Sequence, residues 1–229
     1  MITCLTGQET GLPRPDSIGQ KFTPDGSVLP FSGNTFLCHV DPTSAAHRAL
    51  CAAQDKLRAG SPAGAFTYLP PASLHMTVFE GVCDAYRSSP DWVKDLPLTL
   101  PVAEVTSQFS GRIKDVTLPD HFSITPVEMF CGLGLNVAGA SVTDAAALQT
   151  SRNALRQATG IHRADFGAYQ FHITLAYLLR WLSPPEAEAM VARSNQVLDM
   201  LQHDAGAISL GPVEFCQFND MHAFTPVAA

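Results

Sequence analysis

The stretch Phe171–Tyr177 (FHITLAY) decides how the rest of the chain is interpreted, and it has a counterpart at Leu74–Phe79 (LHMTVF). Each copy is an apolar run that contains a histidine and, two residues later, a threonine. Because side chains alternate between the two faces of a β-strand, the histidine and the threonine share one face. The other face is apolar in both copies and suits packing against helices. The pattern therefore predicts two strands that each present an imidazole beside a hydroxyl.

The same alternation assigns the side chains near the two pairs. Phe79 falls on the face of Thr77, where its ring is expected either to stack on a base or simply to pack. Tyr177 falls on the apolar face of its strand and is expected to point into the core. Tyr169, shortly before the second strand, is expected to line a cleft or to fill the lobe. Further candidates, which lie near a cleft only if their loops fold inward, are Asn34, Lys21 and Arg163.

The elements around the two strands occur in the same order in both halves of the chain. In each half a first strand is followed by a helix, which is predicted from apolar residues at helical spacing. The histidine strand comes next, and a second helix, which begins at a proline, follows the histidine strand. Along the sequence, the two histidine strands are separated by about the length of one small lobe. Two such lobes packed face to face would bring both histidine–threonine faces onto one cleft. The predicted ranges are 35–40, 42–59, 74–79 and 89–96 in the first half, and 127–137, 141–159, 171–177 and 184–202 in the second.

Turn and strand signals assign the remaining segments. Residues 99–107 and 111–117 are predicted as two strands, and 207–218 as a final pair of strands. His121–Pro126 is predicted as a loop, because proline is unfavourable inside a sheet. Asp41 is expected to cap the helix that follows it.

The first 33 residues are rich in glycine, proline and polar residues, and no regular element is predicted before Asn34. They are expected to form either a surface arm wrapped on the body or a loop over the binding cleft. The chain is predicted to be one bilobal domain, 1–229, with the arm at 1–33, a first half at about 34–97 and a second half at about 98–229.

Charge and hydropathy exclude several classes of function. The net charge is −7, and the 14 lysines and arginines are spread thinly along the chain. Long duplex nucleic acid is held by basic surface, so that kind of partner is not expected, whereas one phosphate needs only a few local donors. No apolar run approaches the ~18 residues of a membrane span. A membrane partner is therefore not expected either.

The six cysteines are scattered, without a C-x-x-C pair, and are expected to be small buried hydrophobes. This argues against a zinc site and a disulfide scaffold. Residues 1–20 lack a basic start followed by an apolar block, so no secretory signal is predicted. Together these features favour the cytoplasm.

A His-x-Thr tripeptide alone is a weak signal, since about one His-x-Ser/Thr match is expected by chance in this composition. A third match, His121-Phe122-Ser123, has prolines near it and is set aside. The other two lie in apolar strands at corresponding places. A single strand histidine is usually structural, but two matched polar pairs would each need partners in a core, which favours function. Neither motif holds a carboxylate or a cysteine, so no metal is expected.

The two histidine strands resemble those of the 2H phosphoesterase superfamily, which includes 2′-5′ RNA ligase-like proteins and cyclic nucleotide phosphodiesterases. The resemblance covers about Asn34–Phe218. The chain is similar to an uncharacterised branch of that superfamily in two stretches, Gly33–Thr35 (GNT) and residues 74–82 (LHMTVFEGV). The resemblance implies an α+β, bilobal fold with mainly antiparallel sheets lining a central cleft, helices outside, and no metal or cofactor. The catalytic residues that it implies are His75, Thr77, His172 and Thr174.

The residue types then predict the chemistry. One imidazole can accept a proton while the other donates one, and the threonines can donate to phosphate oxygens. The expected activity is metal-independent hydrolysis of a 2′,3′-cyclic nucleotide, a related cyclic phosphate or a 2′-5′ linkage at an RNA end. The alternatives are a module that binds nucleotides or RNA ends without turnover, and a purely structural pair of lobes. The sequence leaves open which histidine is the base, the exact substrate and the oligomeric state.

Overall fold

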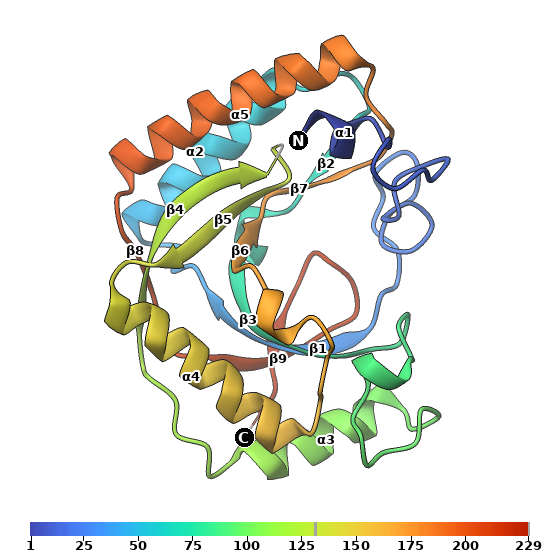
Figure 1. Ribbon diagram of the computed structural model, residues 1–229, viewed down its shortest axis with the longest axis vertical. Coiled ribbons are helices and arrows are strands. Elements are labelled where there is room, and N and C mark those ends of the chain that lie inside the picture. Colours follow the sequence, from blue (N-terminus) through green and yellow to red (C-terminus); the bar gives the residue numbers. More distant parts are fainter. Residues whose placement is uncertain (131, 229) are drawn as a thin grey trace.

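One curled, eight-stranded antiparallel sheet forms the centre of the computed structural model, which describes residues 1–130 and 132–228 (Figure 1). The strand order is β10-β9-β1-β3-β6-β5-β4-β8. Helices α2 and α5 lie together on one outer side of the sheet, and α3 and α4 lie together on another (Figure 1). The predicted α+β class, the antiparallel pairing and the outer position of the helices are confirmed.

The elements have the following bounds. The strands of the large sheet are β1 (Gly33–His39), β3 (His75–Cys83), β4 (Phe122–Phe130), β5 (Gly134–Gly139), β6 (His172–Thr174), β8 (Ile208–Leu210), β9 (Glu214–Phe218) and β10 (Thr225–Pro226). A small second sheet pairs β2 (Phe66–Tyr68) with β7 (Ala176–Leu178). The helices are α1 (Ile2–Leu5), α2 (Ala45–Ala59), α3 (Val102–Ile113), α4 (Val142–Thr159) and α5 (Pro184–Asp204), with 3₁₀ turns at Pro71–Ser73, Ser89–Asp91 and Phe166–Ala168.

The internal repeat is visible in the connections. In the first half α2 connects the antiparallel strands β1 and β3, and in the second half α4 connects the antiparallel strands β5 and β6. The order β1-β3-β6-β5 reads the same from either half, so the two histidine strands are neighbours at its centre. The halves therefore share one continuous sheet. Residues 89–96 form one 3₁₀ turn at Ser89–Asp91, not the expected helix. The helix that follows the first histidine strand is α3, as α5 follows the second.

Local signals set the helix ends. Ser141 accepts a hydrogen bond from the amide of Asp144 at the start of α4, and Gly160 ends that helix in the left-handed region, with φ +73°. Ser183 forms the expected capping box with Glu186. The first cap was predicted wrongly. Ser44, not Asp41, caps α2, while the carboxylate of Asp41 accepts from the amide and hydroxyl of Thr43 in the turn before it.

Three expectations for the middle of the chain are wrong. Residues 102–113 form helix α3 instead of parts of two strands, because Val105 and Phe109, one helical turn apart, are both buried. The expected loop His121–Pro126 belongs mostly to β4, which accommodates Pro126 beside a bulge. Residues 127–137 divide between β4 and β5, and Cys131, within that range, lies outside the described residues.

The final strands form as expected but do not pair with each other. β8 pairs with β4, and β9 pairs with β1, so the C-terminal segment contributes to both ends of the sheet. Strand β10 then adds to β9 at its outer edge.

The N-terminal segment is packed on the body. Leu5, in the short helix α1, and Phe22 are fully buried, which corrects the expectation of no regular element before Asn34. The amide of Leu182 donates to the carbonyl of Leu5, and the amide of Phe31 donates to Asn219. These contacts fix the segment, which we call the N-terminal arm, residues 1–33, against the start of α5 and the C-terminal segment.

The described chain contains no helix with the length and hydropathy needed to cross a bilayer. Its described cysteines carry free thiols, of which Cys38 and Cys216 are buried and Cys4, Cys51 and Cys83 half-buried, so the expectation of burial holds fully for two of them. The remaining cysteine, Cys131, is outside the described residues.

Candidate active site

The two histidine–threonine pairs lie side by side on neighbouring strands of the sheet. Met76 of β3 is the register partner of Ile173 of β6, and both side chains are fully buried on the helix-covered face. One step further along these antiparallel strands brings His75 beside Thr174 and Thr77 beside His172. All four side chains line one pocket, which we call the central pocket. The pairs are therefore neighbours within one sheet and do not face each other from two sheets.

Both imidazoles are held in the same way by the backbone. Nδ1 of His75 lies 2.7 Å from the carbonyl oxygen of Ser73, and Nδ1 of His172 lies 2.9 Å from that of Gln170. A carbonyl can only accept, so Nδ1 carries the proton in each ring. In the neutral ring Nε2 is then the free acceptor, and in the protonated ring it is a donor. Either ring can thus act as base or acid through Nε2.

The ring of His75 lies close to two other rings. The ring of Phe224 packs on it with centroids 4.2 Å apart, and the ring of His39 lies 6.4 Å away. The pKa of His75 is lowered to about 4, mainly by burial. The bond to the carbonyl of Ser73 acts in the opposite direction, and the positive charges that His39 and His172 can carry add to the lowering. His75 is therefore neutral near pH 7.

A β-bulge places Phe79, which was expected either to stack on a base or to pack, in the core. Phe36 and Leu37 of β1 pair with Phe79 and Thr77, so β3 has one extra residue between them. The extra residue reverses the alternation after Thr77. Phe79 is buried in the core against Phe36, and Glu80 lines the central pocket instead.

A break in the second histidine strand places Tyr177 in the central pocket and not in the core. The amides of Leu175 and Ala176 both donate to the carbonyl of Leu133, and β6 ends at Thr174. The alternation is lost at this point. Tyr177, expected in the core, lines the central pocket, and its hydroxyl lies 3.6 Å from the sulfur of Met221.

Two predicted substrate-binding residues do line the central pocket, but their polar groups have partners within the protein. The amide nitrogen of Asn34 donates to the hydroxyl of Thr106 at 2.8 Å, and its oxygen accepts from the amide of Val82 at 3.0 Å. The hydroxyl of Tyr169 donates to the carbonyl of Thr77 at 3.2 Å, and Arg152 lies 3.9 Å from its ring centroid. A role for either residue in substrate binding remains a prediction.

The loops bring two cations to the central pocket. Nζ of Lys21 lies 5.1 Å from the ring centroids of both Phe31 and Tyr177. Burial lowers the pKa of Lys21, but nearby groups, Tyr177 first among them, outweigh this and leave the pKa raised. Arg163 donates to the carbonyl of Gly81 at 2.8 Å and pairs with Asp91 at 3.0 Å.

Sequence reasoning missed part of the aromatic wall of this pocket. Its members come from the N-terminal arm, the loop after β3 and the C-terminal segment, which are distant in sequence and carry no shared pattern. The missed residues are Phe31, Tyr86, Phe218 and Phe224.

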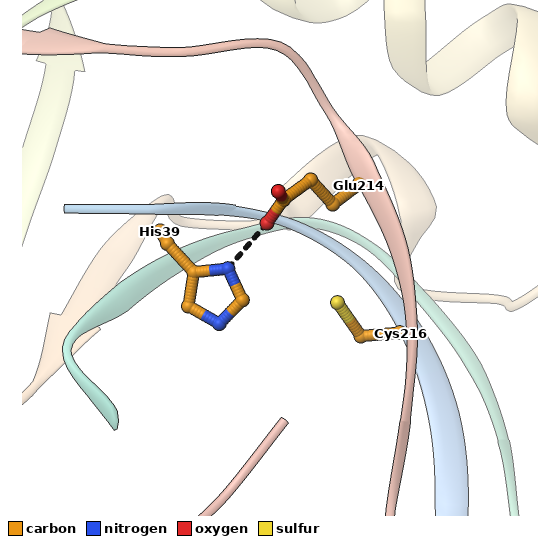
Figure 2. A group of neighbouring side chains, drawn as sticks. All are labelled: His39, Glu214 and Cys216. Atoms are coloured by element: carbon orange, nitrogen blue, oxygen red, sulfur yellow. Dashed lines mark hydrogen bonds and ion pairs between the residues drawn. The ribbon is translucent and has the colours of Figure 1, made fainter. Parts of the chain in front are cut away.

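A mixed group of possible metal ligands lies beside His75. One ligand atom each of His39, Glu214 and Cys216 lies within 4.8 Å of the others (Figure 2). Nδ1 of His39 contacts the carboxylate of Glu214 directly (Figure 2). Burial, with the charge of Glu214, raises the pKa of Cys216 to about 12, which keeps the thiol protonated. Nitrogen, oxygen and sulfur donors suit a transition metal such as zinc, but the set is one ligand short of a closed site.

The fold and the site define a class of protein. An α+β structure with one curled antiparallel sheet and two adjacent histidine–threonine strands has the features expected of a 2H phosphoesterase. A model of the family described as "2H-phosphodiest: Domain of unknown function (DUF1868)" matches residues 21–131, which include the first histidine strand. The chain belongs to this family, which is part of the 2H phosphoesterase superfamily, whose members are generally phosphodiesterases.

The same architecture occurs in a solved structure. The conserved protein of unknown function ATU0111 from Agrobacterium tumefaciens str. C58 is similar to this chain, with a TM-score of 0.90 and 30% sequence identity. The similarity covers 95% of this chain and 94% of that one. No curated protein sequence matches the chain.

Proposed function

We propose that the protein is a phosphodiesterase that hydrolyses a phosphate ester by two-histidine acid–base catalysis without a metal. The observation that carries this proposal is the matched setting of His75 and His172. Each has Nδ1 bound to a backbone carbonyl, each lines the central pocket, and each has a threonine hydroxyl beside it on the neighbouring strand. Substrates of the proposed class are 2′,3′-cyclic nucleotides, related cyclic phosphates and 2′-5′ linkages at RNA ends.

His75 is the proposed base. Its lowered pKa keeps Nε2 unprotonated at neutral pH, so this nitrogen can take a proton from the attacking water. The water oxygen forms a bond to phosphorus, and the opposite P–O bond breaks. His172, in its protonated form, gives a proton to the departing oxygen. Thr77 and Thr174 donate to the non-bridging oxygens, whose negative charge grows in the transition state.

The test is hydrolysis of 2′,3′-cyclic nucleotides in the presence of EDTA. Replacing either His75 or His172 with alanine is expected to lower kcat by roughly two to four orders of magnitude. His121→Ala is the matched control, because His121 belongs to the third His-x-Ser/Thr match and lies exposed, beside Asp120. Full activity in the His75 or His172 variant rejects the scheme. Saturable binding without product would instead support a nucleotide-binding module. The free thiols favour a reducing, cytoplasmic setting for this activity.

A further inference from the structure

A second cavity of about 560 Å³ lies on the other side of the second histidine strand. It shares His172, Thr174 and Tyr177 with the central pocket, so these side chains form a ridge between the two spaces. We call it the arm cavity, because the N-terminal arm supplies one of its walls. Its largest apolar side chains are Leu12, Phe130, Leu133, Leu178 and Trp181.

The wall supplied by the N-terminal arm is held firmly. The indole nitrogen of Trp181 donates to the carbonyl of Leu12 at 2.8 Å, and the hydroxyl of Ser17 donates to the carbonyl of Leu178 at 2.8 Å. Gly7 adopts φ +75°, and a side chain there would approach the Trp181 ring to 2.5 Å. The arm cavity is therefore preformed, as is usual for small-molecule sites.

The two spaces differ in chemistry. The central pocket contains Lys21 and Arg163 together with the carboxylate of Glu80. Arg163 is paired with Asp91 and Glu80, whereas no carboxylate of the described chain lies within ion-pair distance of Lys21. No lysine or arginine lines the arm cavity, its one carboxylate is that of the exposed Asp16, and most of its large side chains are apolar or aromatic. A phosphate placed against His172 and Thr174 would thus have the ammonium group of Lys21 on one side and a mainly apolar space on the other.

We propose that the substrate is a linear phosphodiester with two unlike arms, a polar arm in the central pocket and an apolar alcohol in the arm cavity. This inference rests on the proposed function. A cyclic phosphate has no second arm and would leave the arm cavity empty, so among the substrates considered above a linear ester fits better.

The reaction then has defined products. A water oxygen bonds to phosphorus and passes its proton to Nε2 of His75. The P–O bond to the apolar alcohol breaks, and Nε2 of His172 protonates the departing oxygen. The products are the phosphomonoester of the polar arm and the free alcohol. The alcohol departs toward His172 because this histidine, and not His75, lines the arm cavity.

The test compares the methyl and benzyl esters of adenosine 5′-monophosphate. Each buried methylene group is worth about a fourfold gain in binding, so the benzyl ester is expected to have at least a tenfold higher kcat/KM. Leu12→Asp replaces part of the apolar wall with a second carboxylate, in addition to that of Asp16, and is expected to reduce this preference to about twofold or less. Leu98→Asp is the matched control, since Leu98 is similarly exposed, at 41% against 46% for Leu12, and lies outside both spaces.

Equal kcat/KM for the two esters, or an unchanged preference in Leu12→Asp, overturns the inference while the proposed function stands. If neither ester is hydrolysed, the proposed function fails for linear esters. Binding of the two esters then decides whether the protein takes a ligand with an apolar arm. Titration calorimetry with both esters is then expected to show tighter binding of the benzyl ester by at least tenfold. Equal affinities would overturn the two-arm substrate.

Discussion

Met76 on β3 faces Ile173 on β6 at the centre of the sheet, and this one pairing sets the geometry of the candidate site. It places each histidine beside the threonine of the other half. His75 and His172 are diagonal neighbours, as are Thr77 and Thr174, and the Cα atoms of such neighbours in an antiparallel pair lie about 7–8 Å apart. A single phosphate group can lie between such side chains. The duplicated halves therefore contribute to one site because β3 of the first half pairs with β6 of the second.

The hydroxyls provide a direct test of transition-state stabilisation. Thr77→Val and Thr174→Val keep the shape of the side chain and remove a donor, so each is expected to lower kcat about 10²-fold with a smaller change in KM. Steady-state kinetics on the best substrate measures both values. Thr150→Val, on the exposed side of α4, serves as the control. A change confined to KM would show that the hydroxyls act only in binding.

The pH–rate profile is expected to fall on its acidic side near pH 4, well below the ordinary range of histidine. The cause is the burial of His75, whose pKa is about 4, since the base is lost when this ring is protonated. Phe224→Ala opens the ring to water and is expected to move this limb upward toward pH 6.5. An acidic limb near pH 6.5 in the unchanged protein would contradict the assignment of His75 as base.

His75 also makes the stability of the fold depend on pH. Between about pH 6.5 and pH 4 the unfolded chain binds a proton at this residue and the folded chain does not. The free energy of unfolding is therefore expected to fall as the pH is lowered through this window. His75→Gln removes this part of the dependence. Urea unfolding at several pH values measures it, and identical pH dependence in both proteins would refute the prediction.

Chelation is expected to leave hydrolysis unchanged, because the four side chains of the proposed mechanism include no carboxylate or thiol. Dialysis against EDTA followed by rate measurement tests this. Cys216→Ser removes one possible ligand from the neighbouring group of His39, Glu214 and Cys216, which does not line the central pocket. This variant is likewise expected to keep its rate of hydrolysis. Activity that disappears with EDTA and returns with zinc would show that a metal takes part.

Asn34 is expected to matter for stability first. Its amide joins the side chain of Thr106 on α3 to the backbone of Val82 on β3, and it is buried. Asn34→Ala leaves the buried amide of Val82 without its acceptor, while the hydroxyl of Thr106 keeps its bond to the carbonyl of Val102, and the change is expected to cost about 1–3 kcal/mol of unfolding free energy. Asn153→Ala, exposed on α4, is the control for thermal unfolding. An unchanged Tm in Asn34→Ala would leave substrate binding as the better explanation for this residue.

The sequence predicted the parts of the fold that depend on local chemistry. The serines that begin α4 and α5, and the alternation around His75 and His172, are properties of a few adjacent residues. The errors arise where the surrounding structure decides. Phe79 and Tyr177 exchange environments because each strand loses its alternation just after its threonine, and no residue in either stretch marks the change.

The composition of the site beyond the four motif residues was also not readable from the chain. Phe224 packs on His75 from a segment almost 150 residues away, and Leu12 lies near the second histidine strand because contacts such as that of Trp181 hold the arm there. Such contacts follow from the path of the chain over the finished sheet. The residue types alone carry no signal for them.

The position of β8 and β9 has a consequence during protein synthesis. These strands, from the end of the chain, cover β4 at one edge and β1 at the other. A nascent chain that has emerged only through α5 has both of these inner strands open, with unpaired amide and carbonyl groups along each. Both edges therefore stay open until β8 and β9 have left the ribosome, and chains that terminate after α5 are expected to aggregate.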